Sequence, residues 1–300
     1  MNLIIYVISY PFIWIFSLLP MRVLYWISDF IFILVYYLIR YRKNVVRENL
    51  KLSFPDKKAE EIERLTKKFF RHFIDVMMES VKTFSISKKE MLKRFSYKNP
   101  ELVNSIINEG NNIVLVGAHL ANWEWSVSLP LVLDINIYGT YSKLANPYFD
   151  KRIKKNRTKF GLIAVKTSRT IKNIHENYHK KVQSMYLLLS DQSPMLHKTH
   201  YWRNFFHTKV PVHTGAEIIA KKYNFSVVNY TTKKIRRGYY ETEFSLITNT
   251  PKDFENYQLT DRYFEIVEKS VAEQPECYLW THKRYKHKDK YNDWLKLNRK

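Results

Sequence analysis

Residues 113–125 read IVLVGAHLANWEW, and this stretch decides the fold because an apolar run turns polar within a few residues. The run from Ile113 to Val116 is rich in β-branched residues, which is typical of a buried strand. His119 lies in the small-residue turn that follows, and Glu124 comes after four intervening residues. The pattern predicts a strand that brings an imidazole to the edge of a sheet, with a carboxylate in the next turn.

Strand and helix signals alternate on both sides of this stretch. A long amphipathic helix is expected over 56–87, because apolar residues recur there at helical spacing. Further strands are expected at 135–141, 163–166, 184–189, 226–232, 240–247 and 276–280, and helices at 100–109, 147–160, 170–179, 214–222 and 260–272. The alternation predicts an α/β fold in which a mixed sheet is flanked by helices, with a single catalytic domain over 41–300.

Residues 1–40 are predicted to form a membrane anchor and an interfacial helix. Residues 3–19 are apolar and uncharged, and the second apolar run, 23–39, carries Asp29, which would be costly in mid-bilayer. We therefore favour one anchor followed by a helix packed partly on protein and partly on the interface. A cleaved signal peptide is disfavoured, since no basic region precedes the run and no small-residue cleavage site follows it. A pair of unusually apolar core helices stays an alternative.

The charge balance predicts an anionic partner. The chain carries 50 basic and 28 acidic residues, a formal net charge of +22, which suits nucleic acid, an anionic membrane or an acidic carrier protein. No nucleic-acid-binding motif accompanies the basic segments, so we expect no nucleic acid partner. Basic residues after the second apolar run place the following domain in the cytoplasm by the positive-inside rule; they are Arg40, Arg42, Lys43, Arg47 and Lys51.

Metal and thiol chemistry are not expected. The single cysteine, Cys277, excludes an intrachain disulfide and a multi-cysteine metal site, and its apolar surroundings disfavour a nucleophile. A histidine cluster without acidic or cysteine ligands at suitable spacing gives little support to zinc; its members are His197, His200, His207 and His213.

From its spacing, Glu124 is expected to accept a hydrogen bond from one ring nitrogen of His119. Such a bond fixes the tautomer and leaves the other nitrogen free to take a proton from a hydroxyl. The alternative is a histidine that caps a helix, with an unrelated glutamate on the surface.

The stretch from Gly117 to Glu124 resembles the H-x4-(D/E) motif of the lysophospholipid acyltransferase superfamily, and in particular its lipid A late-acyltransferase branch, which commonly has an N-terminal membrane segment. The resemblance covers residues 10–288. Its other motifs follow in the family's order: Arg47-Glu48-Asn49-Leu50 with Phe54-Pro55, Asn146-Pro147 before a basic helix, Ser190-Asp191-Gln192 after an apolar strand, Phe205-Phe206, Gly215-Ala216, Pro275-Glu276, Trp280 and His282-Lys283-Arg284-Tyr285. One departure is His207, where relatives usually carry glycine, and it puts the local backbone in doubt.

The resemblance implies a glycerolipid-acyltransferase-like fold and a role for each site residue. His119 would be the general base, with Glu124 as its partner. Arg157 would bind acceptor phosphate or the donor's phosphopantetheine, although a solvated surface charge is the alternative. Asp191 and Gln192 would lie in the site wall, where a simple turn is the alternative. Asn122 and Lys143 complete the expected substrate-binding set.

The reaction implied is transfer of a fatty acyl chain from acyl-carrier protein to a hydroxyl of a lipid A precursor, with no further cofactor and no metal. It would take place at the cytoplasmic face of the inner membrane. The absence of a G-x-S-x-G motif agrees with a reaction that forms no acyl-enzyme. Two alternatives stay open: an acyltransferase that acts on a lysophospholipid, glycerol phosphate or aminolipid, and a non-catalytic basic membrane scaffold.

Overall fold

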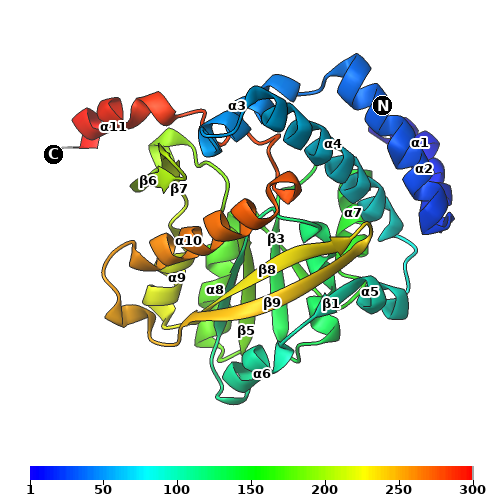
Figure 1. Cartoon of the computed structure of the whole chain (residues 1–300). Helices are drawn as coiled ribbons and strands as arrows, with labels where there is room; N and C mark the ends of the chain where they lie inside the picture. Colours follow the sequence, from blue (N-terminus) through cyan, green and yellow to red (C-terminus); the bar gives the residue numbers. More distant parts are fainter. Residues whose placement is uncertain (299–300) are drawn as a thin grey trace.

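Seven strands form one sheet through the middle of the computed structural model, which describes residues 1–298 (Figure 1). Their order is β1-β9-β8-β2-β5-β3-β4. Strands β8 and β9 form an antiparallel hairpin, whereas the other neighbouring pairs are parallel, so the predicted mixed α/β sheet is confirmed. The strand bounds are β1 Phe95–Tyr97, β2 Ile113–Gly117, β3 Asn136–Tyr141, β4 Ile163–Lys166, β5 Ser184–Leu189, β8 Ser226–Arg236 and β9 Tyr239–Thr248.

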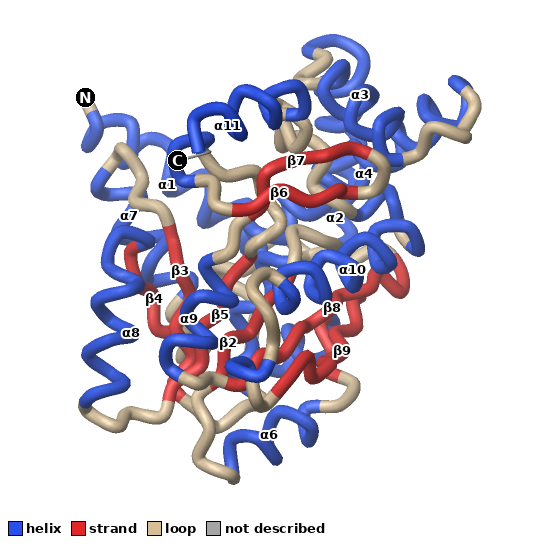
Figure 2. Tube along the Cα trace, turned by 90° about the vertical axis from the view of Figure 1, so that its left-hand side faces the viewer, coloured by secondary structure: helices blue, strands red, loops and turns tan. Residues whose placement is uncertain are grey.

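Helices cover the sheet, and α4 lies between it and the N-terminal helices α1 and α2 (Figure 1). A separate antiparallel hairpin, β6 Tyr201–Phe205 and β7 Thr208–Val212, lies beside α11 (Figure 2). The helix bounds are α1 Asn2–Leu18, α2 Met21–Ile33, α3 Lys43–Ser53, α4 Ala59–Lys82, α5 Lys88–Arg94, α6 Pro100–Asn108, α7 Pro147–Arg157, α8 Thr170–His179, α9 Gly215–Tyr223, α10 Gln258–Glu273 and α11 Tyr291–Asn298.

Most of the predicted elements are present, and β4, α8 and β5 have the predicted bounds. The strand expected at 276–280 is wrong: Pro275–Cys277 is a 3-10 turn, and Tyr278 makes one isolated bridge with Leu120. The segment after His119 winds as a 3-10 helix, η2 Trp123–Leu131, instead of an α-helix. In the β6–β7 turn the left-handed residue is Phe206, with φ 51°, so the backbone at His207 does not require glycine.

Helix α4 connects the N-terminal segment to the domain. One side of the helix is buried against that segment, and the other side is buried against the domain. Its first turn carries Glu60 and Glu61, which suit the positive end of the helix dipole, and Glu61 accepts a hydrogen bond from the Lys58 backbone N–H at 3.1 Å. One face presents an apolar stripe that includes Ile62, Phe69 and Phe70, all nearly inaccessible to solvent.

The two N-terminal apolar runs are both helical, and they differ in length and in how much of their surface is buried. Among residues 1–298, the segment Met21–Ile39, formed by α2 and the π-helical turn η1 Leu34–Ile39, is long and apolar enough to cross a membrane by length and composition, whereas α1 has 17 residues. Both helices expose large apolar side chains, among them Ile4, Ile8, Phe12, Trp26, Phe30 and Leu38. Asp29 is paired with Arg237 through two contacts of 2.8 and 2.9 Å, which offsets much of the cost of a carboxylate in this apolar helix.

Gly117 ends β2 where the backbone meets a tyrosine ring. A Cβ built at this position would lie 2.2 Å from Cε1 of Tyr230, and Tyr230 is buried. The Gly117 carbonyl also accepts a hydrogen bond of 2.7 Å from the hydroxyl of Tyr263. A side chain at residue 117 therefore forces either the ring or the end of the strand to move.

We predict that Gly117→Ala lowers the free energy of unfolding by about 1–3 kcal/mol, the usual cost of overpacking a core. Thermal and denaturant unfolding of the purified protein in detergent would measure this loss. Gly215→Ala is the control, since a Cβ at Gly215 meets no atom within 4 Å. Equal stability of the two variants would contradict the close contact with Tyr230.

Candidate active site

Two parallel strands bring His119 and Asp191 to the same edge of the sheet. Gly117 pairs with Leu189 in the β2–β5 ladder, and His119 and Asp191 each follow two residues later. The carboxyl ends of parallel strands meet at one edge, which is where α/β folds place their sites. The result is a hydrogen bond of 2.7 Å between His119 Nδ1 and Asp191 Oδ1.

The hydrogen bonds around the imidazole assign its tautomer. Asp191 is 1% exposed and its carboxylate accepts, so Nδ1 of His119 carries the proton. Nε2 then presents its lone pair, and the amide nitrogen of Gln192 lies 3.3 Å from it. This is the tautomer that a general base needs, with the free nitrogen on the side away from the buried carboxylate.

Burial and charge act in opposite directions on this pair. Burial lowers the pKa of His119, but the charge and hydrogen bond of Asp191, with a smaller contribution from Glu124, outweigh it and raise the pKa above its ordinary 6.5. Burial raises the pKa of Asp191, yet the facing His119 lowers it to a net value below 3.8. The aspartate therefore stays ionised at neutral pH.

The partner predicted for His119 is not the one observed. Glu124 accepts from Nη2 of Arg157 at 3.2 and 3.3 Å, and within residues 1–298 the structure gives no hydrogen bond between Glu124 and His119. The 3-10 winding of η2 places Glu124 opposite the last turn of α7, which carries Arg157. Glu124 thus acts on the imidazole through its charge alone.

The backbone around His119 is held by the segment near Cys277. Ala121 adopts a left-handed conformation with φ 52°, and its N–H donates to the carbonyl of Cys277 at 2.9 Å. The Leu279 N–H donates to the carbonyl of His119 at 3.0 Å. Burial raises the pKa of the Cys277 thiol to about 12, so the thiol is protonated at neutral pH and is a poor nucleophile.

Two cavities meet at the candidate site. The larger has a volume of about 730 Å³ and is lined by His119, Glu124, Arg157 and Gln192 together with many apolar residues. The smaller, about 300 Å³, lies between α1, α4 and α7 and is called here the apolar chamber; its walls include Ile13, Met77, Val81, Phe84, Phe149 and Ile153. Glu124, Val127 and Arg157 line both cavities, so the chamber adjoins the polar centre.

The remaining predicted site residues are placed as follows. Gln192 lines the larger cavity, whereas Asp191 is buried behind His119 and not in the wall. Asn122 is fully buried and bonded to Glu79, so the structure places it inside the protein instead of against substrate. Lys143 is an exposed loop residue between Ser142 and Leu144, which line the cavity.

Sequence reasoning missed the role of Asp191. The signal was partial: both strands were predicted, but His119 follows the predicted strand end at Val116 by three residues, whereas Asp191 follows Leu189 by two. His213, which the sequence brought up only as a member of a histidine cluster, lines the larger cavity. No group of three or more His, Cys, Asp or Glu that could hold a metal ion is found in the described part of the chain.

The site is an imidazole–carboxylate pair at the edge of a mixed α/β sheet, beside two largely apolar cavities, an arrangement that suits the transfer of an acyl chain. The chain belongs to the bacterial lipid A biosynthesis acyltransferase family, whose model matches residues 2–287. A search of curated proteins gave no match. Family membership implies a lipid A precursor and an acyl donor as substrates, and together with the apolar segment Met21–Ile39 it favours association with a membrane.

The pKa of His119 is predicted to fall when Asp191 is replaced. Asp191→Asn removes the negative charge that raises this pKa, while burial continues to lower it. In the unaltered protein the imidazole titrates above 6.5, and in the variant it titrates below 6.5. NMR of histidine labelled with ¹³C would measure both values, with the His119 signal identified by its loss in His119→Gln. A pKa that stays above 6.5 in Asp191→Asn would contradict the assigned partner.

Proposed function

We propose that the protein transfers a fatty acyl chain from acyl-carrier protein to the hydroxyl of a β-hydroxyacyl group on a lipid A precursor, with His119 as general base. The observation that carries the proposal is the His119–Asp191 pair, which leaves Nε2 of His119 unprotonated, on a residue that lines the larger cavity. The family match supports the choice of acceptor.

In the proposed reaction the acceptor hydroxyl gives its proton to Nε2 as its oxygen attacks the thioester carbon. The resulting imidazolium is stabilised by ionised Asp191 and returns the proton to the departing thiolate, so the thiol leaves neutral. The step needs no cofactor, since the acyl-carrier thioester is a co-substrate. Because the base works as neutral imidazole, transfer decreases as the pH falls through the raised pKa of His119.

Arg157 supplies positive charge where anionic groups of the substrates arrive. Its guanidinium is partly exposed and is held by Glu124 at the junction of the two cavities. A guanidinium placed there binds a phosphate or the developing thioester oxyanion. We therefore propose that Glu124 orients Arg157, and that Asp191 has the orienting role first predicted for Glu124.

The surface next to the apolar chamber supports a carrier-protein donor. Helix α7 exposes Lys151, Lys154 and Lys155, which suit an acidic partner, and the same helix lines the chamber through Phe149 and Ile153. A carrier docked on α7 delivers its acyl chain beside this chamber. The exposed apolar side chains of α1 and α2 support attachment to a membrane, and the basic residues that follow them support a site on the cytoplasmic face of the inner membrane.

We predict that His119→Ala lowers the transfer rate by a factor of about 10²–10⁴, the usual contribution of a general base. The measurement is acyl transfer from acyl-carrier protein to a lipid A precursor by the purified protein, followed by mass spectrometry of lipid A from cells that lack the gene and carry either form. The lipid A of cells with His119→Ala should lack one acyl chain.

Binding of His119→Ala to vesicles is the control and should be unchanged, because His119 lines the larger cavity, whereas the exposed apolar residues belong to α1 and α2. Undiminished transfer by the variant would remove His119 as the base. An unchanged acyl count in lipid A, with His119-dependent acylation of a lysophospholipid, would replace the acceptor by the alternative class.

The apolar chamber is predicted to hold the hydrocarbon chain of the donor. Ile13→Trp fills part of the chamber and should reduce kcat/KM for long acyl donors relative to short ones. Burial of each methylene contributes about 0.8 kcal/mol, so each methylene that is excluded should lower this ratio by about fourfold. Competition between donors of different chain length measures the ratio. Ile8→Trp is the matched control on the same helix, because Ile8 is 60% exposed. If both variants kept the wild-type ratio, the chain would lie outside the chamber.

A further inference from the structure

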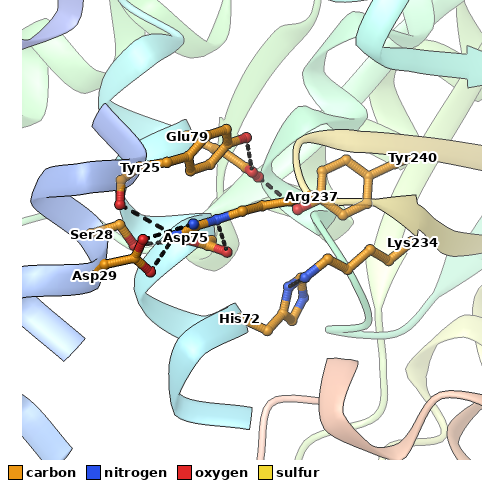
Figure 3. A network of polar contacts seen from close by, with 9 residues as sticks. All are labelled: Tyr25, Ser28, Asp29, His72, Asp75, Glu79, Lys234, Arg237 and Tyr240. Atoms are coloured by element: carbon orange, nitrogen blue, oxygen red, sulfur yellow. Dashed lines mark hydrogen bonds and ion pairs between the residues drawn. The ribbon is translucent and has the colours of Figure 1, made fainter. Parts of the chain in front are cut away.

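Glu79 of α4 is a buried carboxylate with three hydrogen-bond donors around it, of which Tyr25 and Tyr240 are drawn in Figure 3. Its side chain is inaccessible to solvent. The hydroxyl of Tyr25 donates to Oε1 at 2.7 Å, and the hydroxyl of Tyr240 donates to Oε2 at 2.8 Å. The third donor is Nδ2 of Asn122, at 2.6 Å from Oε2. An ionised carboxylate accepts all three bonds, whereas a neutral amide at this position has one oxygen to offer.

The third donor belongs to the active-site turn, defined here as residues 119–125. Asn122 lies inside this turn, between His119 and Glu124, and its Oδ1 accepts the N–H of Trp125 at 3.2 Å. The indole of Trp125 in turn donates to the backbone carbonyl of Glu79 at 3.2 Å. Glu79 therefore holds the turn through both its side chain and its backbone.

The turn needs such support because its backbone includes a residue in an unfavourable conformation. Ala121 is held in the left-handed region, with φ 52°, which costs a non-glycine residue of order 1 kcal/mol. Its carbonyl lies 3.3 Å from Nε2 of His72, another buried side chain of α4. A strained turn persists where its surroundings fix it, and here α4 supplies these contacts.

The other side of Glu79 faces the N-terminal helix α2. Tyr25 is an α2 residue, and neighbouring Ser28 donates to Asp75 of α4 at 2.7 Å (Figure 3). Arg237, from the β8–β9 turn, bridges Asp75 and Asp29 with contacts of 2.6–2.9 Å. Helix α2 also carries Trp26 and Phe30, which are 70% and 62% exposed. Glu79 is thus one hydrogen bond from the active-site turn and one from an apolar surface helix.

We propose that Glu79 is a positioning residue that holds the active-site turn through Asn122, and that Tyr25 makes this hold depend on the seating of α2 against α4. The proposal rests on the proposed role of His119 for its kinetic readout. Burial raises the pKa of Glu79 to about 7 although the hydrogen bonds from the two tyrosines act to lower it, so the carboxylate is mostly ionised at pH 8 and can then accept all three bonds.

An exchange of the two side chains tests the hold on the turn. Asn122→Asp sets two carboxylates against each other at pH 8 and should lower kcat about tenfold or more, with little change in KM. Adding Glu79→Gln restores one amide and one carboxylate, now with the amide at residue 79 and the carboxylate at residue 122. The double variant should return kcat to within about threefold of wild type, which allows for one imperfect hydrogen bond. Acyl transfer and thermal unfolding of the full chain are measured for both single variants and the double variant.

The outcomes separate positioning from simple folding. Recovery of both kcat and thermal stability in the double variant supports the proposal. Recovery of stability without kcat, or of neither, overturns it. Hydrogen exchange of the peptide that covers residues 119–125 gives a readout independent of substrate: exchange should rise in Asn122→Asp and fall back in the double variant. If wild type proves inactive on a lipid A precursor, the proposed function fails while this exchange result still decides the role of Glu79.

Two tyrosine variants test the link to α2. Tyr25→Phe removes the hydroxyl bonded to Glu79 and should increase exchange in residues 119–125 and lower kcat about threefold, the scale of one net hydrogen bond. Tyr36→Phe is the matched control, because the Tyr36 hydroxyl joins η1 to Glu63 of the same helix α4, away from the active-site turn. Equal effects of the two variants on the turn would overturn the dependence on α2.

Discussion

The hydrogen bond between His119 and Asp191 depends on the parallel pairing of β2 with β5, and the rest of the site is arranged around it. In a parallel pair with this register, residues equally far beyond the strand ends come together without a long connecting loop. The buried aspartate then decides which ring nitrogen carries a proton and raises the pKa of the imidazole against the effect of burial. Gly117 permits the arrangement because the ring of Tyr230 occupies the space of a side chain there.

Helix α4 has a second function besides filling the core. Its apolar stripe is buried, and Asp75 and Glu79 are buried where α4 meets α2. Buried carboxylates destabilise a fold unless they are paired and hydrogen-bonded, and both of these are. The same pairing explains Asp29, the one charge in the second apolar run, because Arg237 reaches it from the β8–β9 turn. Tyr25, Ser28 and Asp29 of α2 therefore contact the domain, whereas Trp26 and Phe30 of the same helix are exposed.

The sequence predicts the sheet well because strands β2, β4 and β5 are short apolar runs bounded by polar turns. It predicts the site less well, because the distance between His119 and Asp191 depends on strand register and not on spacing along the chain. The spacing of Glu124 from His119 favoured the nearer carboxylate in sequence. The 3-10 winding after Asn122 turns Glu124 toward Arg157 instead. Asn122 was placed against substrate for a similar reason, since nothing local reveals that Glu79, 43 residues earlier, accepts from its amide.

The position of His119 at the end of β2 depends on the turn that carries it. The turn at 119–125 has a left-handed alanine, short backbone bonds to the segment near Cys277, and side-chain contacts to α4. Removal of any one partner leaves a buried polar group without a hydrogen bond, which costs about 1–3 kcal/mol of stability. The loss destabilises the whole turn, because its contacts form one connected network. Under the proposed function, the alignment of His119 and the attachment of α2 at a lipid surface depend on the same buried carboxylates, because α4 contacts both the turn and α2.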